Sequence, residues 1–193
     1  MALLDKPKVG FFCSSKCPGD LILQSYDLAQ CLRRYNISVM SGFQSPVEEQ
    51  CFRVLSKGMQ PLLFCPARNI SRMRVPAKYR RSIQLNRMTI VSPFVVGVPR
   101  VTRETAFKRN HFIASVAEAV FIVYASSSSH TYRLCEDLLS SNADRILTFK
   151  SKWNQPLIDL GAKAVSLDGA LSWFDENGFV QDTNPDTPMG LFA

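Results

Sequence analysis

Short, uniformly apolar runs recur along this chain, and segments with a helical spacing of apolar residues separate them. Such runs predict buried strands, because parallel strands covered by helices on both faces carry apolar side chains without alternation. We expect strands at residues 9–13, 37–40, 62–65, 88–91, 120–125, 146–149 and 164–165. We expect helices over residues 20–35, 102–117 and 131–139, one from Pro46 to a stop at Gly58, and a shorter one near residues 157–160.

This alternation predicts an α/β fold: a Rossmann-like, three-layer domain in which helices flank a mostly parallel sheet. The chain has 193 residues, a usual size for one domain, and no repeat or linker divides it. We therefore expect a single domain over residues 1–177. Residues 178–193 contain Pro, Asp and Asn and predict a flexible C-terminal tail. The order of the strands in the sheet stays open.

The composition indicates in which compartment the protein acts and whether it holds a metal. No apolar run reaches the roughly 18 residues of a membrane span, and the first eight residues do not resemble a secretory signal. Both observations favour a cytoplasmic protein that does not contact membranes. The six cysteines mostly fall in apolar runs and predict core packing. Cys13 and Cys17 have a spacing that zinc ligands use, but no second close pair accompanies them, so we expect neither a metal nor another cofactor.

The positive charge is concentrated in one segment. The chain carries a net charge of +7, and residues 68–109 hold eleven Arg and Lys side chains and one acid, Glu104. Such a segment is either an ordinary solvated surface or the electrostatic footprint of a nucleic acid or another polyanion. Nine of the eleven are Arg, whose planar guanidinium suits phosphate oxygens and stacks on bases. This composition favours a polyanion as the partner.

Three predicted strand-to-helix turns, at residues 14–20, 41–46 and 126–131, carry residues that suit a phosphate group. In an open parallel sheet, ligands bind at the carboxyl ends of the strands, where helix N-termini offer N–H groups to anions. The candidate binding residues in these turns are Ser14, Ser15, Lys16, Gly42, Phe43, Gln44, Ser126, Ser127 and Ser128.

Two residues of the second turn leave alternatives open. Gly42 either takes a positive φ or allows a close approach of the backbone. Phe43 either stacks on a base or packs beneath the loop. The two histidines also differ, since His111 falls in a helical run and is expected to be structural, whereas His130 follows the third turn and could donate to a phosphate.

Motifs of catalysis are missing from the sequence. We find no nucleophile elbow, no cluster of metal ligands and no phosphoryl-transfer motif. The acids that begin helices, Asp20, Glu48 and Glu49, already have a role there, because they complement the helix dipole or cap the helix. We therefore expect a binding protein and not an enzyme.

The order of these features resembles the central domain of the DNA-processing protein A family, also called Smf. The resemblance spans residues 8–165 and looks closest to a short, stand-alone branch of that family. The segments that carry it are residues 9–19, 39–43, 107–114 with Arg109-Asn110, 120–129 and 161–162, and for the short branch Cys17–Asp20, Gly42–Pro46 and Cys65–Arg68.

The resemblance implies an extended Rossmann-like sheet and a basic pocket at the strand ends that binds single-stranded DNA. By the motif match, that pocket would include Arg109, and Arg68 and Asn110 in the matching segments are further candidate binding residues. Better-known members load recombinase on DNA during natural transformation. Recombinase loading is left open here, because the chain is too short for their additional domains. The first turn reads Ser14-Ser15-Lys16 where the family has Gly-Ser-Arg. The signature of the superfamily's phosphoribohydrolases is missing.

The leading hypothesis is thus a non-catalytic protein that binds single-stranded DNA. The alternative is a small-nucleotide sensor or weak nucleotide hydrolase of the same superfamily, and a third possibility is an interaction scaffold with a vestigial pocket. The resemblance also implies a homodimer. Leu191 and Phe192 resemble the end of a sliding-clamp-binding peptide, the alternative being that both side chains fold back onto the domain.

Overall fold

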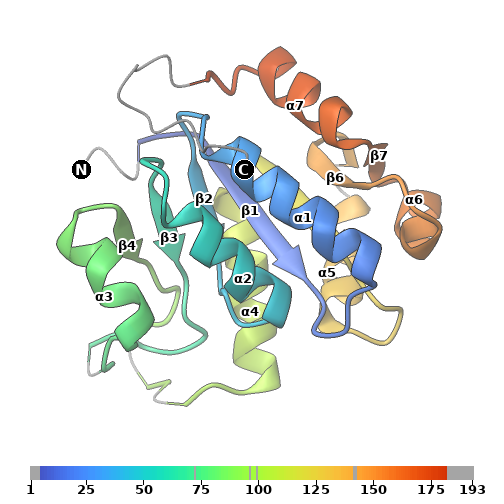
Figure 1. The fold of residues 1–193 in the computed structure, drawn as a ribbon. Helices are drawn as coiled ribbons and strands as arrows, with labels where there is room; N and C mark the ends of the chain where they lie inside the picture. Colours follow the sequence, from blue (N-terminus) through green and yellow to red (C-terminus); the bar gives the residue numbers. More distant parts are fainter. Residues whose placement is uncertain (1–4, 72, 96, 99, 141–142, 182–193) are drawn as a thin grey trace.

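The computed structural model describes residues 5–71, 73–95, 97–98, 100–140 and 143–181 of the chain (Figure 1). Most of the predicted tail, with Leu191 and Phe192, lies outside the described residues. The sliding-clamp contact therefore stays a prediction.

Within the described part, seven strands form one sheet, and every neighbouring pair in it is parallel. The strand order is β4-β3-β2-β1-β5-β6-β7. The α/β prediction is confirmed, and each predicted strand is present to within a few residues. The strands are β1 (Lys8–Cys13), β2 (Ser38–Ser41), β3 (Leu62–Phe64), β4 (Met88–Ile90), β5 (Ala119–Tyr124), β6 (Ile146–Phe149) and β7 (Lys163–Val165).

The direction in which the sheet grows reverses at β1. The chain adds β2, β3 and β4 on one side of β1, then crosses over to place β5 on the other side and continues outward to β7. Val9 of β1 thus pairs with Val39 of β2 on one side and with Ala119 of β5 on the other. In such sheets the loops that leave the two strands at the reversal point diverge to opposite faces and leave a crevice at their carboxyl ends.

Helices cover both faces of the sheet, as Figure 1 shows. Helices α1, α2 and α7 pack on one face, together with α3 beside the edge strand, and α4, α5 and α6 pack on the other. Their bounds are α1 (Gly19–Leu32), α2 (Pro46–Leu55), α3 (Ala77–Gln84), α4 (Arg103–Val116), α5 (His130–Leu139), α6 (Gln155–Asp159) and α7 (Leu167–Glu176).

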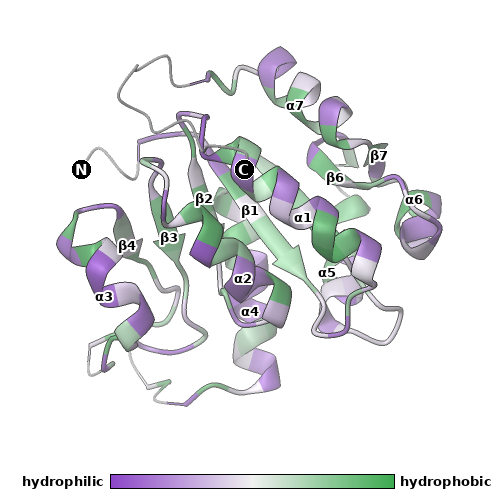
Figure 2. Ribbon diagram, viewed as in Figure 1, coloured by the Kyte–Doolittle hydropathy of each residue, from purple (hydrophilic) through white to green (hydrophobic). Residues whose placement is uncertain are grey.

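The central strands are apolar because both of their faces are buried. In β1, Phe11 points into the core under α1 and α2, whereas Phe12 points into the core under α4 and α5. Figure 2 shows the consequence, since β1 is hydrophobic along its length while the polar residues gather on the outer helices. Continuous burial of this kind explains why the strands read as unbroken apolar runs.

Local capping fixes where the helices next to the crevice begin. Ser45 caps α2 in a reciprocal capping box with Glu48, and Pro46 occupies the first turn. Thr102 caps α4 in the same way with Thr105, as the predicted start at Thr102 requires. Ser129 caps α5 by accepting a hydrogen bond from the backbone N–H of Tyr132 at 3.0 Å.

The structure adds two helices, α3 and α7, and extends the domain beyond residue 177. Phe179 is buried and its ring lies 5.3 Å from that of Phe174. The backbone N–H of Asn36 donates to the carbonyl of Val180 at 2.8 Å. Residues 178–181, which follow the predicted boundary at residue 177, therefore pack against the domain.

Candidate functional site

A cavity of about 840 Å³ lies at the carboxyl ends of β1 and β5, where the sheet reverses its direction of growth. The walls come from the loops after β1, β2 and β5, from the starts of α2 and α5, and from the first half of α4. All three predicted turns therefore contribute to one site. The predicted residues that line it are Ser14, Ser15, Lys16, Gln44, Arg109, Asn110, Ser126 and Ser128.

Four predicted residues do not line the cavity. Gly42 and Phe43 are buried beneath it, Ser127 is exposed outside its lining, and Arg68 lies on the segment after β3, where its carbonyl accepts a hydrogen bond from Ser92. The lining also includes His130, which the sequence predicts as a candidate phosphate donor, and seven residues that were not predicted to bind. These seven are Cys13, Ser45, Glu48, Arg103, Tyr124, Ser129 and Thr131.

Ser14 ties the two loops of the crevice together. Its backbone N–H donates to the carbonyl of Tyr124 at 2.9 Å, and its hydroxyl accepts from the backbone N–H of Ser126 at 3.3 Å. Ser14 is itself buried, whereas Ser15 and Lys16 are exposed. The first turn thus uses Ser14 to hold its shape and presents the next two side chains to the cavity.

The N-terminus of α5 faces the cavity. The side chain of Ser129 caps Tyr132, and the N–H groups of His130 and Thr131 in the first turn have no acceptor within the helix by α-helical geometry. Free N–H groups and the positive end of the helix dipole favour an anion at this position. The Ser-rich turn therefore leads into a helix terminus whose geometry suits an anion.

Arg109 forms the floor of the cavity and is only 4% exposed. Its three nitrogen atoms all donate within the protein, Nη1 to the carbonyl of Cys65 at 2.8 Å, Nη2 to Oε1 of Gln44 at 3.4 Å and Nε to Oδ1 of Asn110 at 2.7 Å. The guanidinium is thus a fixed structural group that joins α4 to the ends of β2 and β3. Burial lowers the pKa of Arg109, and the nearby Glu48 opposes that shift.

Position 42 needs a glycine because the guanidinium of Arg109 lies against its backbone, and not because of its own backbone conformation. A Cβ atom at Gly42 would lie 1.7 Å from Nη1 of Arg109. Gly42 itself does not have a positive φ. The residue of this turn that does is Phe43, with a φ of 46°. The positive-φ alternative for Gly42 is therefore wrong, and the group that comes close to its backbone is the side chain of Arg109.

Phe43 points away from the cavity. Its side chain is 1% exposed, and its ring centroid lies 5.2 Å from that of Phe52 in α2. Its backbone is held on both sides, because its N–H donates to the hydroxyl of Ser41 at 3.1 Å and its carbonyl accepts from the hydroxyl of Tyr79 at 3.5 Å. The prediction that Phe43 stacks on a base is wrong, since the ring is part of the core.

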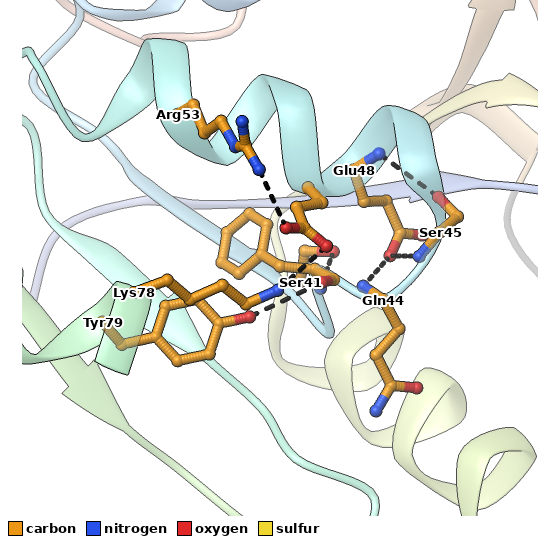
Figure 3. A network of polar contacts seen from close by, with 9 residues as sticks. Ser41, Gln44, Ser45, Glu48, Arg53, Lys78 and Tyr79 are labelled. Atoms are coloured by element: carbon orange, nitrogen blue, oxygen red, sulfur yellow. Dashed lines mark hydrogen bonds and ion pairs between the residues drawn. The ribbon is translucent and has the colours of Figure 1, made fainter. Parts of the chain in front are cut away.

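Glu48 is the buried acid of the site. Its carboxylate accepts from the backbone N–H groups of Cys13 at 3.0 Å, Gln44 at 2.9 Å and Ser45 at 3.3 Å, as Figure 3 shows in part. Burial raises the pKa of this carboxyl, while Arg109 and the three N–H groups oppose the rise. Glu48 is therefore more than a helix cap, because it also fixes the end of β1 to the start of α2.

The cationic side chains that a ligand in the cavity can reach are those of Lys16 and Arg103, which are both exposed. The charge of Arg109 is buried opposite Glu48. Of the basic segment 68–109, only Arg103 and Arg109 belong to the described lining of this cavity, while Arg80 and Arg81 are exposed on α3. The segment is thus spread over several elements and does not converge on one point.

Two further observations bear on the predicted chemistry. In the described part of the chain, no cluster of three or more His, Cys, Asp or Glu residues could hold a metal ion, and none of its helices is long and apolar enough to cross a membrane. His111 lies on α4, with Nε2 3.1 Å from the carboxylate of Asp137, and does not line the cavity, whereas His130 does.

Comparison with protein-family models and with curated proteins gave no match. Among solved structures, DNA processing protein A from Streptococcus pneumoniae is similar, with 18% identity and a TM-score of 0.71 over 88% of this chain and 62% of that one. The Helicobacter pylori protein, described for its single-stranded DNA binding mode, has 14% identity and a TM-score of 0.72 over 91% and 83%.

The molybdenum cofactor binding protein from Rippkaea orientalis is also similar, with 12% identity and a TM-score of 0.62 over 89% of this chain and 97% of that one. Our chain spans 62% of the Streptococcus protein. At these identities the likeness shows a shared fold. The chain thus has the Rossmann-like fold of DNA processing protein A, which is the fold that its sequence resemblance predicts.

Proposed function

We propose that this protein binds single-stranded DNA and holds a backbone phosphate in the cavity between the β1 and β5 loops. The observation that carries the proposal is the meeting of Lys16, Arg103 and the uncapped N–H groups of α5 at one cavity. Cations and a helix N-terminus together suit a phosphate better than any neutral ligand. The shared fold with a protein described as binding single-stranded DNA supports this choice of ligand.

The proposal includes no catalysis. Among the described lining residues, Glu48 is the single carboxylate, and three backbone N–H groups already occupy it. A general base must reach a proton of the substrate or of an attacking water. Glu48 is held away from that role by its hydrogen bonds, which favours a binding site over a hydrolase.

A small nucleotide is the second candidate ligand. The cavity volume of about 840 Å³ is typical of small-molecule sites, and a molybdenum cofactor binding protein shares the fold. In that case the same phosphate position would be used, and the exposed arginines of α3 would take no part in binding.

A comparison of ligands distinguishes the two. We would measure the thermal unfolding of the protein with a short oligothymidylate and with deoxyribonucleoside monophosphates. A ligand at 100 times its Kd stabilises the protein by about 2.7 kcal/mol. Stabilisation by the oligonucleotide at far lower concentration than by any mononucleotide supports DNA, and the reverse order supports the nucleotide.

Charge variants identify the site. Lys16→Ala and Arg103→Ala remove exposed cations from the cavity, and each is expected to weaken oligonucleotide binding. Lys163→Ala is the matched control, because Lys163 is an exposed cation at the start of the edge strand β7 and outside the cavity lining. Equal effects of all three variants would contradict the assignment of the cavity.

With this function we also propose a cytoplasmic homodimer that acts in DNA recombination, including natural transformation. These points rest on the resemblance to DNA-processing protein A. Light scattering coupled to size-exclusion chromatography tests the dimer, for which a single mass near the chain mass of 21.7 kDa would be contrary evidence.

A further inference from the structure

A second cavity, of about 510 Å³, adjoins the first. The two share the walls formed by Ser15, Lys16 and Tyr124, so a ligand can extend from one into the other without leaving the surface. The remaining walls differ in character from the first cavity, because they are largely apolar. They are Cys17, Pro18, Ile22, Pro46, Val47 and Trp153.

Trp153 is the feature of this cavity that the fold does not explain. Its side chain is 45% exposed, whereas the other tryptophan, Trp173, is 7% exposed and packs against Phe174 and Phe179. A large exposed aromatic side chain in a cavity wall adds little to the stability of the fold, since most of its burial energy is not realised. Its ring is available to a ligand.

The turn that carries Trp153 is firmly anchored. Trp153 lies in the 3-10 turn η2 (Lys152–Asn154), and the hydroxyl of Ser151 accepts its backbone N–H at 3.3 Å. The next residue, Asn154, is fully buried and donates to the carbonyls of Val123 at 3.0 Å and Phe149 at 3.2 Å. The two strands β5 and β6 therefore hold the turn that carries the indole at the cavity, which is the preorganisation that a stacking surface needs.

We infer that the second cavity is a nucleobase subsite, in which a base stacks on Trp153 while an adjoining phosphate occupies the first cavity. This inference rests on the proposed function. Lys16, in the wall that the two cavities share, would then lie beside the phosphate that adjoins the stacked base. Apart from the weakly polar thiol of Cys17, the polar side chains that could read a base edge are those of the shared wall, Ser15, Lys16 and Tyr124. The subsite accordingly binds any base through its π-face, as expected of a sequence-independent single-strand site.

The cation near Trp153 is consistent with this assignment. Nζ of Lys152 lies 5.0 Å from the centroid of the indole ring. An exposed cation at this position adds positive charge next to the stacking surface and attracts the phosphate backbone that accompanies each base.

Tryptophan fluorescence tests the subsite directly. Titration of the wild-type protein with oligothymidylate is expected to quench the emission, and the Trp153→Phe variant, which retains Trp173, is expected to lose that quenching. Stacking of one base on an aromatic side chain contributes about 1–3 kcal/mol, so Trp153→Ala should weaken binding at constant salt at least about fivefold. Leu160→Ala, which removes an exposed apolar side chain outside both cavities, should have no effect.

Failure of the subsite and failure of the proposed function give different results. An oligonucleotide of the same length that lacks bases should bind wild-type protein about as weakly as the base-containing strand binds Trp153→Ala. If oligothymidylate binds wild-type protein without quenching and Trp153→Ala has no effect, the subsite is refuted and DNA binding stands. If only deoxyadenosine monophosphate binds and quenches Trp153, the subsite stands and the proposal of DNA is refuted. Absence of binding by either probe refutes both.

Discussion

Substitution of Gly42 by Ala tests the role assigned to Arg109 as a buried structural group. The added Cβ would lie 1.7 Å from Nη1, 2.3 Å from Cζ and 2.6 Å from Nη2 of Arg109. Since the guanidinium must then move, it loses its hydrogen bond to the carbonyl of Cys65 and its contact with Gln44. A hydrogen bond to a charged group contributes about 1.5–3 kcal/mol, so we expect a loss of about 3 kcal/mol in the free energy of unfolding.

Thermal unfolding followed by circular dichroism measures this loss. For a chain of this length, about 3 kcal/mol corresponds to a fall in Tm of roughly 6–12 °C. A double-mutant cycle with Arg109→Ala isolates the cause, because the double variant should be no less stable than Arg109→Ala alone. Strictly additive costs, or a Gly42→Ala protein as stable as the wild type, would refute the steric explanation.

Three other predictions concern Glu48 and the C-terminal segment. Glu48→Ala removes the acceptor of three buried N–H groups and leaves Arg109 without its counter-charge, so denaturant unfolding should report a loss of about 3–5 kcal/mol. Because burial raises the pKa of Glu48 above its ordinary value of 4.5, its favourable contribution is complete below that pH and is lost as the pH rises through the raised pKa. The stability of wild-type protein relative to Glu48→Gln should therefore fall as the pH rises above 4.5 and through the raised pKa, and a difference that rises with pH would contradict this. Phe179→Ala should cost about 3–5 kcal/mol, whereas a cost near zero in denaturant unfolding would show that residues 178–181 do not belong to the domain.

The sheet could be predicted from the sequence because its strands are buried on both faces. Burial of this kind produces unbroken apolar runs such as Val120–Ala125, and the Ser, Gly and Pro residues that follow them mark the turns. Helix α3 could not be predicted in the same way, since only Tyr79 and Ser82 are buried in it and its remaining residues give no apolar period. Helix α7 did carry a signal, in the helical spacing of Ala170, Trp173 and Phe174.

The location of the site could be predicted, but the roles of its residues could not. Three polar turns that follow parallel strands must lie on the same edge of the sheet, and the structure brings them together there. Whether Phe43 points to the core or to the cavity depends on Phe52 in the following helix and on Tyr79, which lies 36 residues away. In the same way, the burial of Arg109 depends on the close approach of Gly42. Long-range contacts of this kind leave no local pattern.

The burial of Arg109 also changes how DNA binding should be tested. A loss of binding in Arg109→Ala could follow from a disturbed cavity floor, since the side chain holds Cys65, Gln44 and Asn110 in place. Lys16 is the better probe, because it is exposed and makes a wall of both cavities.

The measurement that tests the central claim most directly is fluorescence anisotropy of a labelled single-stranded oligonucleotide across a series of salt concentrations. If phosphates bind at the β1 and β5 loops, the logarithm of the affinity should fall linearly with the logarithm of the salt concentration, by about 0.7 for each phosphate neutralised on a single strand. Lys16→Ala should make that slope shallower by about one phosphate, while Lys163→Ala leaves it unchanged. Binding that does not depend on salt, or no binding even at low salt, would contradict the proposed function.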